Sequence, residues 1–278
     1  MILIADSGST KTHWALLRPD NTVVMFTTPG LNPHHCDEKM FRDVLTETFG
    51  FCKDTVTKVF FYGSGCSATA QTAFVNRCLH DYFAAAAVEV ENDVVAAARA
   101  LLGEAEGYIS IVGTGSVCAH YNGRHLTRIS PSLGYMVDDE GSGAQLGKEL
   151  LKAYFYNLLP EKLTKAFAEN YNLQRDDVLR NLYHQARPNA YLASFVPFLK
   201  ANLHDETMAA MVFKCFDRFF ACHSQLIFTN KNLPSAFAGS VAFYFRDILT
   251  DAASKHGMKI YDIQKEPIGA LVGFHRGK

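Results

Sequence analysis

The chain lacks the features that tie a protein to a membrane, a nucleic acid or an oxidising compartment. Its seven cysteines are odd in number and include no C-x-x-C pair, which argues against a disulfide framework and a zinc ribbon. The apolar run at 82–88 stops at Glu89, well short of the roughly 18 to 20 residues that a membrane helix needs. The formal net charge is -1, with Lys and Arg spread along the chain, so we expect no nucleic acid and no membrane as partner.

The N-terminus also lacks room for a signal peptide. The apolar residues 1–4 lead directly to Asp6 and Gly8, which leaves no basic region, apolar core and cleavage site. We therefore expect a cytoplasmic protein with reduced thiols. With 278 residues and 48% hydrophobic composition, the chain is long enough for one large domain or two medium-sized ones.

The two halves of the chain open with similar patterns. Strands are predicted first at 1–5, 13–18 and 22–27, and again, after a polar stretch at 103–107, at 108–112, 117–121 and 124–129. Asn122-Gly123 marks a hairpin turn in the second set. Between the two sets, strands near 56–62 and 88–90 alternate with helices near 37–49, 68–82 and 93–102. This repetition predicts an α/β protein with two domains, 1–105 and 106–278, and a ligand in the cleft between them.

The second half is predicted to be the more helical one. Amphipathic patterns indicate helices at 141–158, 161–168, 176–186, 190–202 and 206–228. A last β-like run at 235–238 ends in Gly239-Ser240, and Pro267 precedes a closing helix at 268–274, which we expect at the domain interface.

The segment Asp6–Thr12 predicts a phosphate clamp. Gly8 allows backbone amides to approach an anion, Ser9 and Thr10 offer hydroxyl donors, and Lys11 adds charge. Asp6, at the end of an apolar strand, is expected to hold Mg²⁺ through water, because this ion dehydrates reluctantly and takes few carboxylates. A Walker-type P-loop is excluded, since the glycines that its spacing requires are missing.

Two further turns support a nucleotide site. Gly113, Thr114, Gly115 and Ser116 follow an apolar strand, as the first clamp does, so a pair of hairpins holding one polyphosphate is predicted. The small residues around Gly239 and Ser240 would allow adenosine to pack on the backbone, although plain helix–strand packing is the simpler interpretation of that segment alone.

At this point the chain resembles a known family. The segments DSGSTKT at 6–12, NDVVAAA at 92–98, GTGS at 113–116, DEGSG at 139–143 and AGS at 238–240 are similar to the BadF/BadG/BcrA/BcrD ATPases, particularly their N-acetylglucosamine kinase-like members. The resemblance implies two ribonuclease-H-like, actin-like ATPase domains with ATP in the interdomain cleft. It also implies two connecting helices, which begin at Asp93 and Pro267 and cross closely through Ala96, Ala97, Gly269, Ala270 and Gly273.

The resemblance also implies roles for individual residues. Asp93 would accept the proton of a sugar hydroxyl that attacks the γ-phosphate, and a helix cap is its alternative role. Asn32, Ser64 and Asp139 would contact the sugar. Asp138 stands where the family usually has glycine, which bears on the loop that carries Asp139.

The expected activity is transfer of phosphate from ATP, with Mg²⁺, to an amino sugar, most simply the 6-hydroxyl of N-acetylglucosamine. N-acetylmuramic acid and glucosamine stay open as acceptors, because a few pocket contacts would separate them. An ATPase that activates an acyl-CoA dehydratase or reductase would need cluster cysteines, for which Cys118 and Cys222 are the candidates. A non-catalytic sensor or a filament-forming relative is the other alternative, and a homodimer is compatible with the helical second half.

Overall fold

The chain divides into two compact units. A computed structural model describes residues 1–8 and 10–276, so Ser9, a predicted phosphate ligand, lies outside the described residues. The first unit consists of residues 1–105 and the segment that begins at Glu266, and the second consists of residues 106–265. The sequence analysis had assigned the segment from 266 onward to the second domain, whereas its helix packs against a helix and two strands of the first unit.

The first unit is built on one mixed sheet. Its strands are β1 (Ile2–Ser7), β2 (Lys11–Leu17), β3 (Val23–Pro29), β4 (Lys58–Gly63) and β5 (Ala87–Asn92), in the order β3-β2-β1-β4-β5. Its helices are α1 (Glu38–Phe49), α2 (Thr69–Tyr82), α3 (Asp93–Leu101), α12 (Ile268–His275) and the 3₁₀ turn η1 (Lys53–Thr55). The strands β1, β4 and β5 run parallel, so their carboxyl ends meet at one edge of the sheet.

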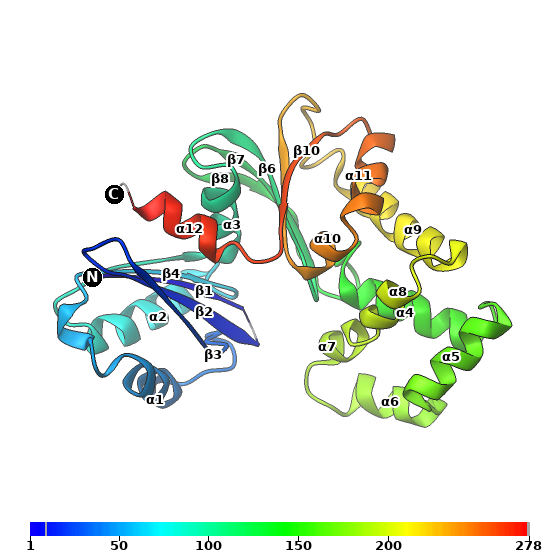
Figure 1. The fold of residues 1–278 in the computed structure, drawn as a ribbon, viewed down its shortest axis with the longest axis horizontal. Helices are drawn as coiled ribbons and strands as arrows, with labels where there is room; N and C mark the ends of the chain where they lie inside the picture. Colours follow the sequence, from blue (N-terminus) through cyan, green and yellow to red (C-terminus); the bar gives the residue numbers. More distant parts are fainter. Residues whose placement is uncertain (9, 277–278) are drawn as a thin grey trace. The chain divides into compact units, whose positions relative to one another are not determined.

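The helices of the first unit cover both faces of this sheet (Figure 1). Because strand side chains alternate, Leu3 and Ala5 point into a core with Trp14, Phe61 and residues of α1 and α2. The opposite face receives α3 and α12, which pack against each other and against the strands. There the His275 ring stacks on Phe60 with centroids 3.9 Å apart.

The predicted close crossing of α3 and α12 depends on alanine and not on glycine. Ala96 and Ala97 are fully buried, as the crossing requires. Gly269 and Gly273, however, are exposed, and an added Cβ at either position would meet nothing within 4 Å. Their assignment to the crossing is therefore wrong, since the buried side of α12 is formed by Ile268, Leu271, Val272 and His275.

The second unit repeats the topology of the first. Its strands are β6 (Glu106–Val112), β7 (Ser116–Asn122), β8 (Leu126–Ile129), β9 (Ser235–Ala238) and β10 (Ile260–Gln264), in the order β10-β9-β6-β7-β8. An antiparallel meander is thus extended by two parallel strands in each unit, which confirms the predicted α/β class with two similar halves. Strand β10 lies beyond 235–238, the last strand that the sequence predicts, and is not among the predicted elements.

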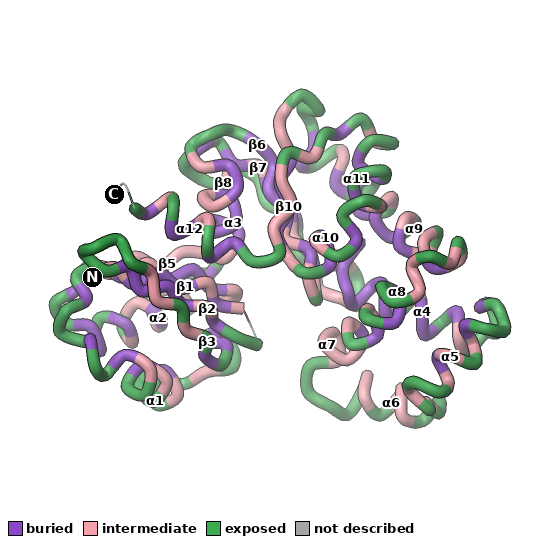
Figure 2. Tube along the Cα trace, in the orientation of Figure 1, coloured by how far each residue is buried: buried purple, intermediate pink, exposed green. Residues whose placement is uncertain are grey.

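Helices make up most of the remaining second unit. They are α4 (Gly143–Phe155), α5 (Glu161–Tyr171), α6 (Arg175–Tyr183), α7 (Pro188–Ala193), α8 (Val196–Ala201), α9 (Glu206–His223), α10 (Ser240–Tyr244) and α11 (Arg246–Lys255). Their buried positions line one shared core, as Figure 2 shows. None of the helices in the described part of the chain is long and apolar enough to cross a membrane.

Two of these helices differ from the predicted ones. The expected helix 190–202 is interrupted between Ala193 and Val196, because Pro197 has no amide hydrogen to continue the helical hydrogen bonds. The helix expected to reach residue 228 ends at His223. At Gly147 of α4 the chain does require glycine, since a Cβ there would lie 1.8 Å from the carbonyl oxygen of Leu192 in α7.

Candidate functional site

The predicted site residues of the first unit gather at the carboxyl edge of its sheet. Ser7 pairs with Gly63 of β4, and Gly63 pairs with Asn92 of β5, so three strand ends are aligned. β1 is followed by the hairpin after Asp6, β4 by the turn that contains Ser64, and β5 by the helix that starts at Asp93. The carboxyl edge of parallel strands is the usual position of ligand sites in α/β sheets.

The hairpin between β1 and β2 is held by a small hydroxyl cluster. The Ser7 and Thr12 hydroxyls are 2.8 Å apart, and the amide of Leu31 donates to both at 3.2 Å. The Gly8 amide donates to the Lys11 carbonyl at 3.0 Å, and the Gly30 amide donates to the Thr10 carbonyl. These bonds fix the hairpin and bring the loop after β3 beside it.

Two predicted sugar ligands come together in this region. Asn32 is buried, and its amide nitrogen donates to the Ser64 hydroxyl at 3.3 Å. The Ser64 amide in turn donates to the Ser7 carbonyl at 2.8 Å. Gly65, which has a φ of 84°, packs so tightly that a Cβ would lie 2.7 Å from the Asn32 side-chain oxygen. The pair is therefore a formed polar group at the strand ends.

Asp93 does not cap its helix. The cap of α3 is Asn92, whose side-chain oxygen accepts from the Val94 amide at 2.8 Å. Asp93 is the first helical residue, and burial raises the pKa of its carboxyl to about 6, although hydrogen bonds from the amides of Val94 and Asp93 itself act in the opposite direction. The competing role of helix cap thus belongs to its neighbour, and Asp93 is a half-buried carboxylate poised near neutral pH.

Asp6 lies on the face of the sheet that α3 covers, directly opposite His13 of β2. The pKa of its carboxyl is raised to about 7: burial is the largest cause, the charges of Asp93 and Glu266 also raise it, and the charge of Lys11 acts in the opposite direction. Ionisation of Asp6 is therefore opposed by the neighbouring Asp93 carboxylate. Two mutually repelling carboxylates in a desolvated position favour a bound cation.

Glu266 is the residue of this region that the sequence analysis missed. Its carboxylate lies 3.3 Å from the Lys11 ammonium and 3.6 Å from His13 Nε2. It also contributes to the raised pKa of Asp6. Nothing in the local sequence marks it, since it precedes Pro267 and reaches the hairpin only because α12 packs on the first sheet.

The strand ends of the second unit carry the other predicted nucleotide contacts. Gly239 follows β9 with a φ of 112°, and a Cβ there would lie 2.4 Å from the carbonyl oxygen of Val112, the last residue of β6. Close packing against β6 therefore requires glycine at position 239. Ser240 is the first residue of α10. The 113–116 hairpin is closed by the Gly113 amide, which donates to the Gly115 carbonyl at 3.0 Å.

Asp139 supports this second hairpin directly. Its carboxylate accepts from the Ser116 amide at 2.9 Å and lies against Gly115, where a Cβ would be 2.9 Å from the same oxygen. Burial is the main reason why the pKa of Asp139 is raised. Asp139 has a φ of 64°, which is a left-handed conformation. The residue before it, Asp138, stands where the family usually has glycine. Asp139 belongs to the second unit, whereas Asn32 and Ser64 belong to the first, and its carboxylate is engaged by the backbone of Ser116.

The next residue, Glu140, continues this support. The Ser116 hydroxyl donates to the Glu140 carbonyl at 2.8 Å, and the Gly143 amide donates to the Gly113 carbonyl at 2.7 Å. The Glu140 carboxylate pairs with Arg218 Nε at 2.9 Å and accepts from the Gln145 side chain. Thus the hairpin is braced by α4 and α9, and the side chain of Ser116 is already engaged.

The arrangement in the first unit suits general-base chemistry beside a divalent cation. Asp93 has a pKa close to neutral, which is where a carboxylate base is most effective. Asp6 offers a hard oxygen ligand of the kind that Mg²⁺ prefers, and this ion commonly takes one or two carboxylates with water and phosphate oxygens. No group of three or more His, Cys, Asp and Glu residues able to hold a metal occurs in residues 1–8 and 10–276. The carboxylate of Asp6 therefore fits an Mg²⁺ ion whose other ligands are water and phosphate oxygens, and not an ion enclosed by protein ligands alone.

Known proteins resemble the chain over its whole length. A solved structure from Porphyromonas gingivalis, described as a candidate N-acetylglucosamine kinase, is 33% identical with a TM-score of 0.94, and covers 100% of this chain and 99% of that one. A Streptomyces griseus glucokinase of the ROK family, solved with glucose and AMPPNP, is 13% identical with a TM-score of 0.58 over 98% of this chain and 97% of its own, and shows the fold.

A curated relative adds a partial match. The N-acetylmuramic acid/N-acetylglucosamine kinase of Clostridium acetobutylicum is 24% identical over 156 residues. The match spans 53% of this chain and about half of that protein's length, 51%. No family model matches the chain.

Proposed function

Because the chain belongs to the N-acetylglucosamine kinase-like family of actin-like sugar kinases, we propose that it transfers the γ-phosphate of ATP to the 6-hydroxyl of N-acetylglucosamine. The observation that carries this proposal is the alignment of three strand ends in the first unit. That alignment brings two carboxylates and two polar side chains to one edge: Asp93, Asp6, Asn32 and Ser64.

Asp93 is proposed to act as the base. As the sugar oxygen forms its bond to the γ-phosphorus, the bond from this phosphorus to the bridging oxygen of ADP breaks, and the hydroxyl proton moves to the Asp93 carboxylate. A pKa of about 6 leaves most of the carboxylate ionised at neutral pH and still able to accept the proton. Asn32 and Ser64 are proposed to orient the sugar by hydrogen bonds.

The two hairpins are proposed to bind the phosphates of ATP. At Gly8 and Gly113 no side chain blocks the approach of a phosphate, although the amides of these two glycines already close their own hairpins. Lys11 adds a positive charge, and Thr10 and Thr114 are exposed hydroxyl residues. Asp6 would hold Mg²⁺, which neutralises phosphate charge during transfer. Gly239 and Ser240 stay our proposal for the adenosine contact, in addition to the packing role of Gly239.

Asp139 keeps its proposed sugar contact only if one carboxylate oxygen turns outward. One of its oxygens already accepts from the Ser116 amide at 2.9 Å, so the second oxygen is the one that a hydroxyl would meet. The same residue would then connect sugar binding to the phosphate hairpin of the second unit.

The experiment that tests the activity is ADP release from Mg-ATP with a panel of free sugars. N-acetylglucosamine, N-acetylmuramic acid, glucosamine and glucose are compared at equal concentrations, with Asp93→Asn as the inactive control. Acceleration by N-acetylglucosamine that disappears in Asp93→Asn supports the proposal, and mass spectrometry of the product locates the phosphate. ADP release that is slow and independent of every sugar contradicts it.

N-acetylmuramic acid is the second candidate acceptor, because the curated relative is named for both sugars. Its lactyl carboxylate would need room or a positive charge beside the sugar pocket, which the smaller N-acetylglucosamine does not. A higher kcat/KM for the muramic acid in the panel would reverse the order of the two candidates.

The electron-delivering ATPase is not favoured. Cys118, one of its two candidate cluster ligands, is fully buried in the core of the second unit, and burial raises the pKa of its thiol far above the usual range. A metal-binding thiolate would instead need a lowered pKa.

A further inference from the structure

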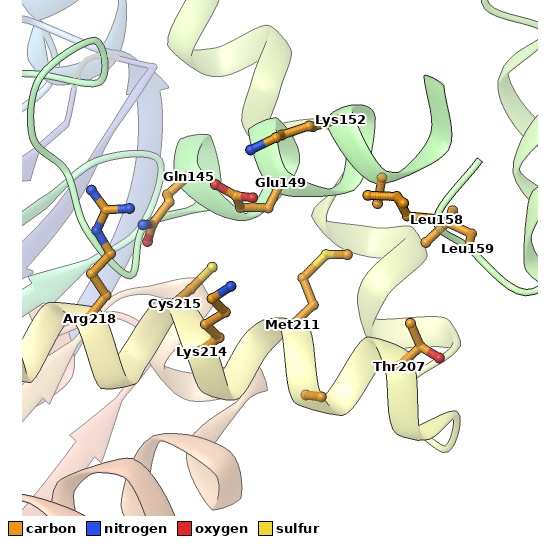
Figure 3. A pocket seen from close by; sticks show the side chains of 12 residues that line it. Gln145, Glu149, Lys152, Leu158, Leu159, Thr207, Met211, Lys214, Cys215 and Arg218 are labelled. Atoms are coloured by element: carbon orange, nitrogen blue, oxygen red, sulfur yellow. The ribbon is translucent and has the colours of Figure 1, made fainter. Parts of the chain in front are cut away.

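A groove between α4 and α9 stands apart from every residue proposed above for sugar or ATP. It lies wholly in the second unit and has a volume of about 470 Å³, which is within the range of small-molecule sites. Its walls come from α4, the residues that follow α4, and α9, as Figure 3 shows. None of the segments that carry the family resemblance lines the groove. The lining residue nearest to one of them is Gln145, two residues after the DEGSG segment.

The charged side chains of the groove lie toward its Arg218 end. Lys214 and Arg218 come from α9 and Lys152 from α4, and Figure 3 shows the Glu149 carboxylate between the two lysine side chains. Arg218 is paired with Glu140 at 2.9 Å. The remaining charged residues are two lysines and one carboxylate, which leaves one net positive charge for an anionic group.

The other end is apolar. Leu158 and Leu159 follow α4, and Met211 faces them from α9 (Figure 3). Leu158 is 66% exposed, so its side chain is accessible to a ligand. Methionine adapts its shape to ligands more readily than branched residues do. This end suits an alkyl body.

From this division we propose that the α4–α9 groove binds a small anionic amphiphile, with a carboxylate or phosphate head between Lys152 and Lys214 and an alkyl tail on Leu158, Leu159 and Met211. The cavity volume is sufficient for a tail of about eight carbons, whereas a folded protein segment would need a longer trough. A cation of the same shape would meet the lysines and be disfavoured.

The groove is also connected to the 113–116 hairpin. Arg218 and Gln145, which line it, both contact the Glu140 carboxylate, and the Glu140 carbonyl accepts from the Ser116 hydroxyl at 2.8 Å. A head beside Lys214 lies one turn of α9 from Arg218, so its negative charge competes with Glu140 for the guanidinium. Occupancy should therefore change the support of the hairpin and alter the KM for ATP, a consequence that rests on the proposed kinase activity.

The site is tested first by binding alone, without nucleotide or sugar. Octanoate and octyl phosphate are titrated into the protein by calorimetry, with octylammonium as the probe of equal tail and opposite charge. We expect the two anions to bind at least about tenfold more tightly than octylammonium. The relative affinity of octanoate and octyl phosphate distinguishes a carboxylate head from a phosphate head.

Charge variants then locate the binding. Lys214→Glu should weaken both anions by about tenfold or more, whereas Lys162→Glu, a matched reversal at the start of α5 outside the groove, should leave them unchanged. Equal affinity for anions and octylammonium, equal losses in the two variants, or no heat at about 10 mM ligand would each overturn the site.

The coupling is tested separately. Octanoate should change the KM for ATP of the unmodified protein at least about threefold and leave that of Lys214→Glu unaltered. An unchanged KM with intact binding would overturn the link to the hairpin. Because binding is read without turnover, a protein that phosphorylates none of the sugars would contradict the proposed function and still allow the groove to be judged.

Discussion

The two units share a sheet topology but use their carboxylates differently. In the first unit, Asp6 and Asp93 have pKa values raised to about 7 and about 6, and burial is the largest cause for both. In the second unit, Asp139 accepts from the Ser116 amide and Glu140 pairs with Arg218. The comparison shows carboxyls with raised pKa values at the edge of the first sheet, where we propose the chemistry, and a hairpin supported by carboxylates in the second unit.

The sharpest test of this difference is the same substitution in both units. Asp93→Asn should lower kcat by about 10²- to 10⁴-fold with little change in ATP binding, because the base is lost. Asp139→Asn should lower kcat less than tenfold, since an amide oxygen can still accept from Ser116. Steady-state ADP release with N-acetylglucosamine measures both. Similar losses in the two variants would remove the proposed distinction.

The pH dependence should follow the first unit. Asp93 must be ionised to act as base, and its pKa of about 6 lies above the usual value, so kcat/KM should fall about tenfold per pH unit below about 6. The same decline should be absent from the residual activity of Asp93→Asn. An acid limb that persists in this variant would assign the titration to another group.

The glycines of the two hairpins should be needed for ATP and not for folding. A Cβ at Gly8 would meet Lys11 only at 3.5 Å, and one at Gly113 would meet nothing within 4 Å. Gly8→Ala and Gly113→Ala should therefore keep the melting temperature and raise the KM for ATP about tenfold, because the methyl group occupies the approach of a phosphate.

Gly239→Ala is the control for these two variants. The added Cβ would lie 2.4 Å from the Val112 carbonyl oxygen, and the backbone φ of 112° is strained for alanine. This variant should therefore lower the melting temperature of the protein without ATP. If all three variants lose stability alike, the hairpin glycines serve packing, and their nucleotide role loses its support.

Stability should respond in opposite directions in the two units. The pKa of Asp6 is higher in the folded than in the unfolded state, so its contribution is complete at low pH and is lost as pH rises through about 7. At pH 8, without Mg²⁺, Asp6→Asn should raise the melting temperature by a few degrees. Asp139→Ala should lower it, since the buried Ser116 amide loses its acceptor at a cost of about 1–3 kcal/mol. Calorimetric melting of both variants measures the signs, and equal signs would contradict this account.

The smallest expected effect belongs to Glu266. Its ion pair with Lys11 is largely exposed, so Glu266→Gln should change the KM for ATP by about fivefold at most, corresponding to about 1 kcal/mol. Glu266→Asp should restore part of the change. A loss of kcat comparable with that of Asp93→Asn would instead make Glu266 part of the chemistry.

Much of the fold was predictable because its signals are local. Apolar runs followed by small hydroxyl residues appear twice, at Asp6 and at Gly113, and they identified both meanders and the two-domain class. Strand β10 escaped because Ile260–Gln264 is a five-residue edge strand with no fully buried position, so its alternation is weak. Pro197 could have predicted the break between α7 and α8.

The candidate site was only partly predictable, for a different reason. Asp93 and Asn32 lie in recognisable segments, and their assigned roles stay predictions. The bond from Ser116 to Asp139 spans 23 positions, and Glu266 meets Lys11 across 255 positions. Such contacts depend on how helices pack on a sheet, which no short pattern in one sequence encodes. The predicted homodimer likewise stays a prediction.

The first unit is discontinuous, and this has a consequence for a shortened chain. A chain that ended at residue 265 would still contain every strand and helix of the second unit, whereas the first unit would lack α12. The side of α3 that packs on α12 would then be open to water. A truncation at the C-terminus should therefore destabilise the N-terminal sheet that carries Asp6, although 255 positions separate Lys11 from Glu266.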